Sequence, residues 1–226
     1  MNRGEEDYIK AIYELKIFDE KIEYITNQQL VDFFNHSAQT VSEMVKKLNK
    51  HKLIIYTPYK GSILTEKGEN AAIRLIRVHR IWELFLVKHL NYTWEEVHEE
   101  AEKLEHVTSN LLEKRMYSFL GKPKKGPLGN PIPNEDGKFE NSLNIKLLDA
   151  KKEKIYKIVK VSDSIDLLKY LNHLNLRIGS TIKIISIDSF GEILELEYKE
   201  TKIFIAKKIA NMIFVSEDLE GSIWKN

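Results

Sequence analysis

The chain has 226 residues, 42% of them hydrophobic, so it is large enough for one or two domains with a real core and is not a disordered chain. Its 35 basic and 34 acidic residues give a formal net charge of +1, which neither favours nor excludes nucleic acid, because such binding depends on local patches. The absence of cysteine excludes disulfides and thiolate metal sites. Without an apolar signal core or a spanning run, we expect a cytoplasmic protein with no membrane partner.

The first section, residues 1–65, has the element order of a winged helix-turn-helix domain. Apolar spacing predicts three helices, over residues 7–16, 27–34 and from 37 or 38 to 51. Thr26 is a good N-cap for the second of them. Two extended runs follow around a hairpin loop, at residues 53–56 and 62–65.

The third of these helices is the candidate for DNA reading, because the second helix of a helix-turn-helix lies in the major groove. The exposed positions expected to contact DNA lie on it and on the hairpin: Ser37, Gln39, Thr40, Ser42, Lys46, Lys47, Tyr59 and Lys60. Glutamine pairs with adenine, hydroxyls bond to bases or phosphates, and lysines set affinity through phosphates. The alternative is the solvated face of an ordinary helix.

The second section, residues 66–140, is expected to be helical and to supply a dimer interface. One long helix should follow the N-cap Thr65 as far as about His89, and a second should run from Trp94 to Leu120. Residues 121–138 hold four of the five prolines and predict a structured turn. The alternative role for the two helices is a simple scaffold.

The third section, residues 141–226, predicts short strands at 155–161, 181–187, 192–198, 203–206 and 212–215. One helix, residues 164–174, interrupts them. This pattern is typical of a small β-barrel. The expected fold class is therefore mainly α with a small β domain.

Potential metal ligands gather in the second section. Four of them fall within a sector of about 100° on one helix: His98, Glu102, Glu105 and His106. His79 and Glu83 lie one turn apart on the preceding helix. Imidazole and carboxylate suit a divalent first-row metal, and a metal site beside a DNA reader predicts a metal-sensing repressor. The alternatives are an acidic surface helix and structural histidines.

Several segments resemble the diphtheria-toxin-repressor family of metal-dependent transcriptional repressors, which includes the manganese transport regulators. The matching segments are 6–15, 40–45, 59–61, 64–68, 79–83, 94–106 and 129–133. The third section is similar to the FeoA-like small β-barrel of that family. The resemblance covers nearly the whole chain and implies a winged helix-turn-helix, a helical dimerisation domain and a C-terminal barrel.

The resemblance also implies two sets of metal ligands. The primary set is Asp7, Glu102, Glu105 and His106. The ancillary set is His79, Glu83 and His98, completed by Asp163 from the barrel, with Asp166 as its substitute. Alternatives from the residues alone are that Asp7 complements a helix dipole and that Asp163 caps the following helix.

Two departures from the family pattern concern these sites. Lys10 stands where two-domain manganese regulators carry a second carboxylate, and Gly126 stands where some three-domain relatives carry cysteine. The remaining donors are all nitrogen and oxygen, which favours Mn²⁺, with Fe²⁺ as the alternative.

The function implied is a Mn²⁺-responsive repressor that binds palindromic operator DNA as a homodimer and controls metal-uptake genes. A metal-dependent hydrolase is a competing class, but the sequence has no glycine-rich phosphate loop, nucleophile elbow or zincin motif. A regulator that senses an organic ligand and an adaptor that does not bind DNA are further alternatives.

Overall fold

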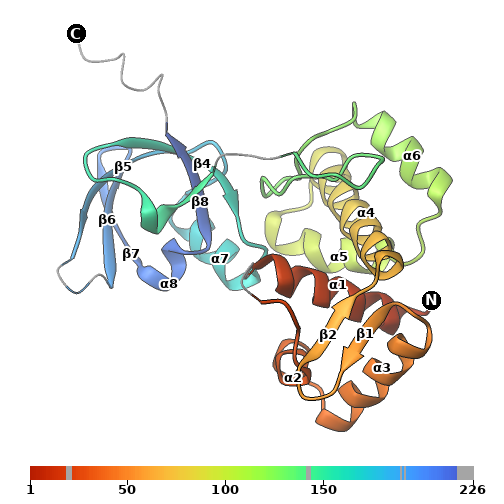
Figure 1. Ribbon diagram of the computed structural model, residues 1–226. Coiled ribbons are helices and arrows are strands. Elements are labelled where there is room, and N and C mark those ends of the chain that lie inside the picture. The colour runs from red at the N-terminus through yellow and green to blue at the C-terminus, as the bar shows by residue number, and fades with distance from the viewer. Residues whose placement is uncertain (19–21, 141–143, 189, 191, 218–226) are drawn as a thin grey trace. The chain divides into compact units, whose positions relative to one another are not determined.

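The structure, a computed structural model, describes residues 1–18, 22–140, 144–188, 190 and 192–217. The chain divides into two compact units (Figure 1). The first comprises residues 1–82, 101–121 and 132–139, and the second comprises residues 83–100, 122–131 and 140–226. No helix among the described residues is both long and apolar enough to cross a membrane.

The amino-terminal part of the first unit is the expected winged helix-turn-helix. Its elements are α1 (Arg3–Phe18), α2 (Asn27–Phe34), α3 (Ala38–Lys50), β1 (Ile54–Thr57) and β2 (Gly61–Leu64). Thr26 and Gln29 form a capping box before α2, and the Ser37 hydroxyl accepts a hydrogen bond from the Thr40 backbone before α3. The three predicted helices are confirmed, and the strands lie within one residue of the predicted runs.

The hairpin depends on one glycine. β1 and β2 pair antiparallel, and Ile25 adds a backbone bridge to Ser62. Gly61 has a φ of +128°, and a Cβ there would lie 2.4 Å from the carbonyl oxygen of Ile25. Only glycine allows the chain to turn and approach Ile25 this closely.

The apolar faces of these helices meet in one buried core. Its fully buried side chains include Ile9, Ile12, Leu30, Val41 and Leu48. Because α1 buries one face in this core, its first turn has a fixed position relative to α3. That position brings charged residues of α1 to the metal-ligand candidates described below.

Three helices follow, α4 (Glu66–Leu90), α5 (Trp94–Glu105) and α6 (Asn110–Phe119). The predicted single helix from Trp94 to Leu120 is therefore wrong. The chain leaves the helix at His106, the Thr108 hydroxyl donates to the Leu104 carbonyl at 2.7 Å, and Ser109 caps α6 by accepting from the Leu112 backbone. Serine and threonine side chains compete with the helical backbone in this way.

Contacts from α4 hold this break in place. Trp82 Nε1 donates to the Thr108 hydroxyl at 2.7 Å, and Arg74 Nη2 donates to the Thr108 carbonyl at 2.8 Å. Arg77 Nε donates to Glu113 Oε1 of α6 at 2.8 Å, in a pair that is almost fully buried. The segment that carries His106 is thus anchored on both sides.

The second unit contains an antiparallel sheet in the order β3-β8-β4-β5-β6-β7. Its strands are β3 (Ile145–Lys146), β4 (Ile155–Val161), β5 (Thr181–Ile187), β6 (Ile193–Tyr198), β7 (Thr201–Ala206) and β8 (Ile213–Glu217). The helical elements are η1 (Leu147–Asp149), α7 (Ile165–His173) and α8 (Lys207–Ala210). Their apolar faces share a second core, which includes Tyr156, Leu168 and Ile184. The predicted strands and the interrupting helix are confirmed within two residues.

Candidate metal centre and DNA-reading surface

The first unit brings the amino-terminal part of α1 to the end of α5. Asp7, Glu102 and His106 each offer a ligand atom, and these atoms lie within 4.8 Å of one another. The His106 side chain is only 6% exposed, and its Nε2 lies 2.9 Å from Asp7 Oδ1. The structure thus brings together three of the four residues expected for the primary set.

The contact between Asp7 and His106 fits a cation better than it fits a hydrogen bond. Nε2 and Oδ1 lie 2.9 Å apart, and neither of these buried atoms has a hydrogen-bond partner among the described residues. Burial raises the pKa of Asp7, the nearby imidazole of His106 opposes the rise, and the nearby Glu102 carboxylate adds to it. Two buried donors that face each other beside another carboxylate suit a divalent ion.

Glu6 is a part of this centre that sequence reasoning missed. Its Oε2 lies 2.7 Å from Nδ1 of His106, on the opposite side of the ring from Asp7. Histidines that bind metals commonly donate their other ring N–H to a carboxylate, which fixes the tautomer and the ring orientation. The one available signal was that Glu6 precedes Asp7 on the same helical turn.

Glu105, the fourth residue of the expected primary set, has a different set of contacts. Its carboxylate is fully buried, and both of its oxygens accept from Lys10 Nζ at 2.9 Å. Nδ1 of His79 lies 2.6 Å from Glu105 Oε2, and Glu105 Oε1 lies 3.7 Å from His106 Nε2. Glu105 therefore lies between His79 and His106 and makes an ion pair with Lys10.

The second unit holds most of the expected ancillary set. Glu83, His98 and Asp163 offer ligand atoms within 4.8 Å of one another, and Nδ1 of His98 lies 2.8 Å from Asp163 Oδ2. Glu83 is 1% exposed. Asn172 of α7 donates to Glu95 of α5 at 3.1 Å, which keeps the loop before α7 beside α5. Asp163 is thus the barrel residue that reaches His98.

The expected DNA-reading residues lie on the outer face of α3 and on the hairpin. Ser37, Gln39, Thr40, Lys46, Tyr59 and Lys60 are exposed, and Ser42 and Lys47 are half-buried. Lys60 Nζ lies 5.6 Å from the ring centroid of Tyr24. The buried core side chains Val41, Val45 and Leu48 occupy the opposite face of α3.

Glu5 connects α1 to this reading helix. Its Oε1 lies 2.6 Å from Nδ1 of His51, immediately after α3, and 3.5 Å from Lys47 Nζ. Burial alone would raise the pKa of Glu5, but hydrogen bonds from the Asn2 backbone and from His51 outweigh it and lower the pKa. One turn of α1 thus contacts the reading helix through Glu5 and the candidate metal centre through Glu6 and Asp7.

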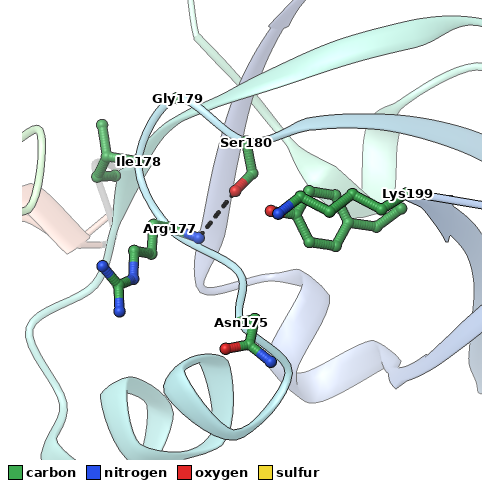
Figure 2. A pocket seen from close by; sticks show the side chains of 7 residues that line it. Asn175, Arg177, Ile178, Gly179, Ser180 and Lys199 are labelled. Carbon is green, nitrogen blue, oxygen red and sulfur yellow. Dashed lines mark hydrogen bonds between the residues drawn. The ribbon is translucent and has the colours of Figure 1, made fainter. Parts of the chain in front are cut away.

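The second unit also has a cavity of about 370 Å³, and its lining differs from the two clusters of candidate metal ligands (Figure 2). It is lined by Asn175, Arg177, Ile178, Gly179, Ser180, Tyr198 and Lys199. The Ser180 hydroxyl accepts from the Arg177 backbone at 3.0 Å, and Figure 2 shows the Arg177 guanidinium directed away from Ser180 and Lys199. The lining residues include no carboxylate or imidazole, so this cavity does not suit a divalent metal.

A winged helix-turn-helix domain whose first helix also reaches a cluster of carboxylates and imidazoles defines a class, the metal-responsive DNA-binding regulators. Family models match almost the whole chain. Residues 2–62 match the N-terminal DNA binding domain of the iron dependent repressors, residues 65–134 match their metal binding and dimerisation domain, and residues 145–217 match the FeoA domain.

Two solved structures are similar over nearly their whole length. The manganese regulator SloR is 36% identical, with a TM-score of 0.80 over 95% of this chain and 98% of SloR. ScaR with bound Zn²⁺ is 37% identical, with a TM-score of 0.81 over 95% of this chain and 99% of ScaR. The chain belongs to the family of iron-dependent and diphtheria toxin repressors.

A curated relative matches over a shorter span. The iron-dependent repressor IdeR of Mycobacterium tuberculosis (strain ATCC 25618 / H37Rv) is 36% identical over 128 residues, which cover 57% of this chain and 54% of IdeR. The aligned part of this chain thus spans about half the length of that relative. Membership in a family of repressors decides against the hydrolase alternative, while the identity of the metal stays open between manganese and iron.

Proposed function

We propose that the chain is a Mn²⁺-responsive transcriptional repressor of the cytoplasm, which binds palindromic operator DNA as a homodimer and controls metal-uptake genes. The observation that carries this proposal is the set of contacts that Glu5, Glu6 and Asp7 make near the start of α1. Glu5 contacts α3 and its C-cap His51, while Glu6 and Asp7 contact His106. A single helical turn, about 5.4 Å long, therefore links the candidate metal centre to the reading helix.

The donor set supports a divalent metal with a preference for oxygen and nitrogen ligands. Asp7, Glu102 and His106 are the proposed ligands, with Glu105 beside them. When bound, the ion would supply the positive charge that lets these carboxylates stay ionised close together. ScaR, described as manganese-activated, has also been solved with Zn²⁺ and Cd²⁺, which supports a divalent-metal site in a similar protein. Fe²⁺ is the alternative, supported by the similarity to IdeR, which is named an iron-dependent repressor.

The proposed mechanism is a docking of α1. Asp7 and Glu6 approach His106 only when α1 lies against the end of α5, and Glu5 then holds the carboxyl-terminal end of α3. In a dimer this fixes the separation of two reading helices at one DNA turn, about 34 Å, or a multiple of it. Without the docking, the two helices lose that spacing and the operator is released.

The proposed contacts with DNA divide into two kinds. Gln39, Ser37, Thr40 and Ser42 stand near the N-terminus of α3, where a reading helix meets base edges. The cationic and aromatic groups are proposed to contact the phosphate backbone, namely Lys46, Lys47, Tyr59 and Lys60. The first kind would set the choice of operator and the second kind the affinity.

An apolar surface on α6 and the loop before it supports the dimer. Val107 is 78% exposed, Phe119 is 66% exposed, and Leu111 and Leu112 are also exposed. Large apolar side chains gathered on one exposed segment typically mark an interface, and a self-complementary patch gives a two-fold dimer. This agrees with the match to a dimerisation domain over residues 65–134.

For the second metal site we propose Glu83, His98 and Asp163 as ligands, supported by their convergence in the second unit. His79 precedes Glu83 by one turn of α4, and its membership of this set stays a prediction from spacing and resemblance. A ligand from the barrel would make that domain part of the metal response. Asp166 is not required in this proposal.

The proposal is tested by selecting duplexes from a random library with the full-length protein, once with Mn²⁺ and once with a strong chelator. We expect palindromic sequences to be enriched only with Mn²⁺. Mn²⁺ affinity should then rise with the selected duplex by the same factor by which Mn²⁺ raises duplex affinity. Asp7→Ala should lose this coupling, and the exposed Glu135→Gln should keep it. Equal DNA binding in chelator would contradict the proposal and favour a regulator that senses an organic ligand.

A further inference from the structure

The ammonium group of Lys10 lies inside the ring of candidate metal ligands. Its Nζ is 2.7 Å from Glu102 Oε1, 2.9 Å from both oxygens of Glu105, and 3.4 Å from Nδ1 of His79. The whole residue is 7% exposed. All four residues belong to the first unit, where α1 buries Lys10 beside α4 and α5.

The residues around Lys10 form a cation site of their own. His79, Glu102 and Glu105 offer ligand atoms within 4.8 Å of one another, and this group is distinct from the group of Asp7, Glu102 and His106. Glu102 belongs to both groups, so the two positions are adjacent. A pair of neighbouring positions joined by a carboxylate is an arrangement that two divalent ions can share.

Lys10 is held there as a charged group. Its Nζ makes ion pairs with Glu102 at 2.7 Å and with Glu105 at 2.9 Å, and the side chains of Lys10 and Glu105 are 8% and 0% exposed. The N–H of His79 Nδ1 donates to Glu105 at 2.6 Å. Because this nitrogen carries a proton, it does not accept from Lys10, and the 3.4 Å contact between Lys10 and His79 is not a hydrogen bond. The ammonium thus binds the two carboxylates from a buried position.

We propose that Lys10 is a built-in cation that fills the second of two adjacent cation positions, so that the first unit binds one divalent ion, at Asp7, Glu102 and His106, instead of two. The inference rests on the proposed function only for that first position. The Lys10 ammonium thus keeps a second divalent cation out of the position between His79, Glu102 and Glu105.

A second consequence concerns the affinity for the single ion. Lys10 shares Glu102 with the first position, so the ion must bind a carboxylate that is already partly neutralised. The positive charge of Lys10 also repels a divalent ion at close range in a poorly solvated site. Lys10 therefore raises the metal concentration at which the first position fills.

The test counts Mn²⁺ ions bound per chain by equilibrium dialysis with metal analysis, on full-length protein without DNA. Lys10→Gln should bind one more Mn²⁺ per chain than the wild type, and its electron paramagnetic resonance spectrum should show a coupled pair of ions. Its first ion should bind about tenfold or more tightly than in the wild type. Lys10→Arg, which keeps the charge, and Lys16→Gln, an exposed lysine on the same helix, should match the wild type.

An unchanged number of ions in folded Lys10→Gln would overturn the inference. If Lys10→Gln fails to fold, anomalous scattering from wild-type crystals soaked in Mn²⁺ decides the question. We expect no peak among His79, Glu102 and Glu105, with Lys10 still on Glu105, and a peak at that place would overturn the inference. A wild type that binds no Mn²⁺ in dialysis would instead refute the proposed function and the inference with it.

Discussion

Replacing Glu6 with glutamine tests whether this residue orients His106 for metal binding. The Glu6 carboxylate lies 2.7 Å from Nδ1 of His106, and the two side chains are only 17% and 6% exposed. A partly buried hydrogen bond to a charged group contributes about 1.5–3 kcal/mol. Glutamine keeps the length and one acceptor oxygen but loses the charge, so we expect it to lose about 1–2 kcal/mol of this interaction.

That loss should appear in metal affinity, because Glu6 raises the basicity of the ring whose Nε2 faces Asp7. A loss of about 1–2 kcal/mol corresponds to Mn²⁺ binding that is about 5- to 30-fold weaker. The assay is a Mn²⁺ titration of the DNA-free protein, followed by circular dichroism to confirm the fold. Glu135→Gln, on an exposed turn, is the matched control.

A Glu6→Gln protein that binds Mn²⁺ within twofold of the wild type would refute the orienting role. It would mean that packing alone fixes the His106 ring, or that His106 does not bind the ion. A variant that binds Mn²⁺ more weakly but reaches the same DNA binding at saturating Mn²⁺ would support the role. In that case enough Mn²⁺ still docks α1, and only the affinity for the ion has changed.

Three further predictions concern the fold, the dimer and the DNA contact. Glu113→Ala should lower the free energy of unfolding by about 3–5 kcal/mol in denaturant titrations, because it removes the carboxylate that pairs with the buried Arg77; a loss below 1 kcal/mol would contradict this. Leu111→Asp with Phe119→Asp should shift sedimentation from dimer to monomer with unchanged circular dichroism, whereas a persistent dimer would place the interface elsewhere. Lys46→Ala should reduce the salt dependence of operator binding by about one phosphate contact without changing sequence preference, and a changed preference would assign Lys46 to a base.

Most of the fold could be predicted because local signals agree with tertiary packing. Thr26 and Ser37 are side-chain caps that can be read directly from the sequence, and they begin α2 and α3 in the structure. At the interruption between α5 and α6 the sequence offers one such cap, Ser109, but it does not show that α5 ends at Glu105. No glycine or proline marks the interruption, and it is held by contacts of Thr108 with Trp82 and Arg74, which lie far away in the sequence.

The candidate site could be predicted at the level of residue types but not of pairing. Turn spacing brings His98, Glu102 and Glu105 to one side of a helix, and the structure has them on α5. Spacing cannot show that Glu105 bonds to Lys10 or that His106 lies just beyond the helix, because both depend on how α1 packs. The roles of Glu6 and Glu5 were invisible for the same reason, since their partners are about 100 and 46 residues away.

The three consecutive acids near the start of α1 have a consequence for how this protein can evolve. Neighbours on a helix point about 100° apart, so Glu5, Glu6 and Asp7 fan over roughly 200° of its circumference. In the proposed mechanism, metal binding and DNA binding are thereby coupled through one helix, without a flexible linker between them. In that mechanism, substitutions at Lys10 would change how many ions bind and how tightly, and substitutions along α3 would change the operator. A shorter side chain at Glu5 would uncouple metal binding from DNA binding.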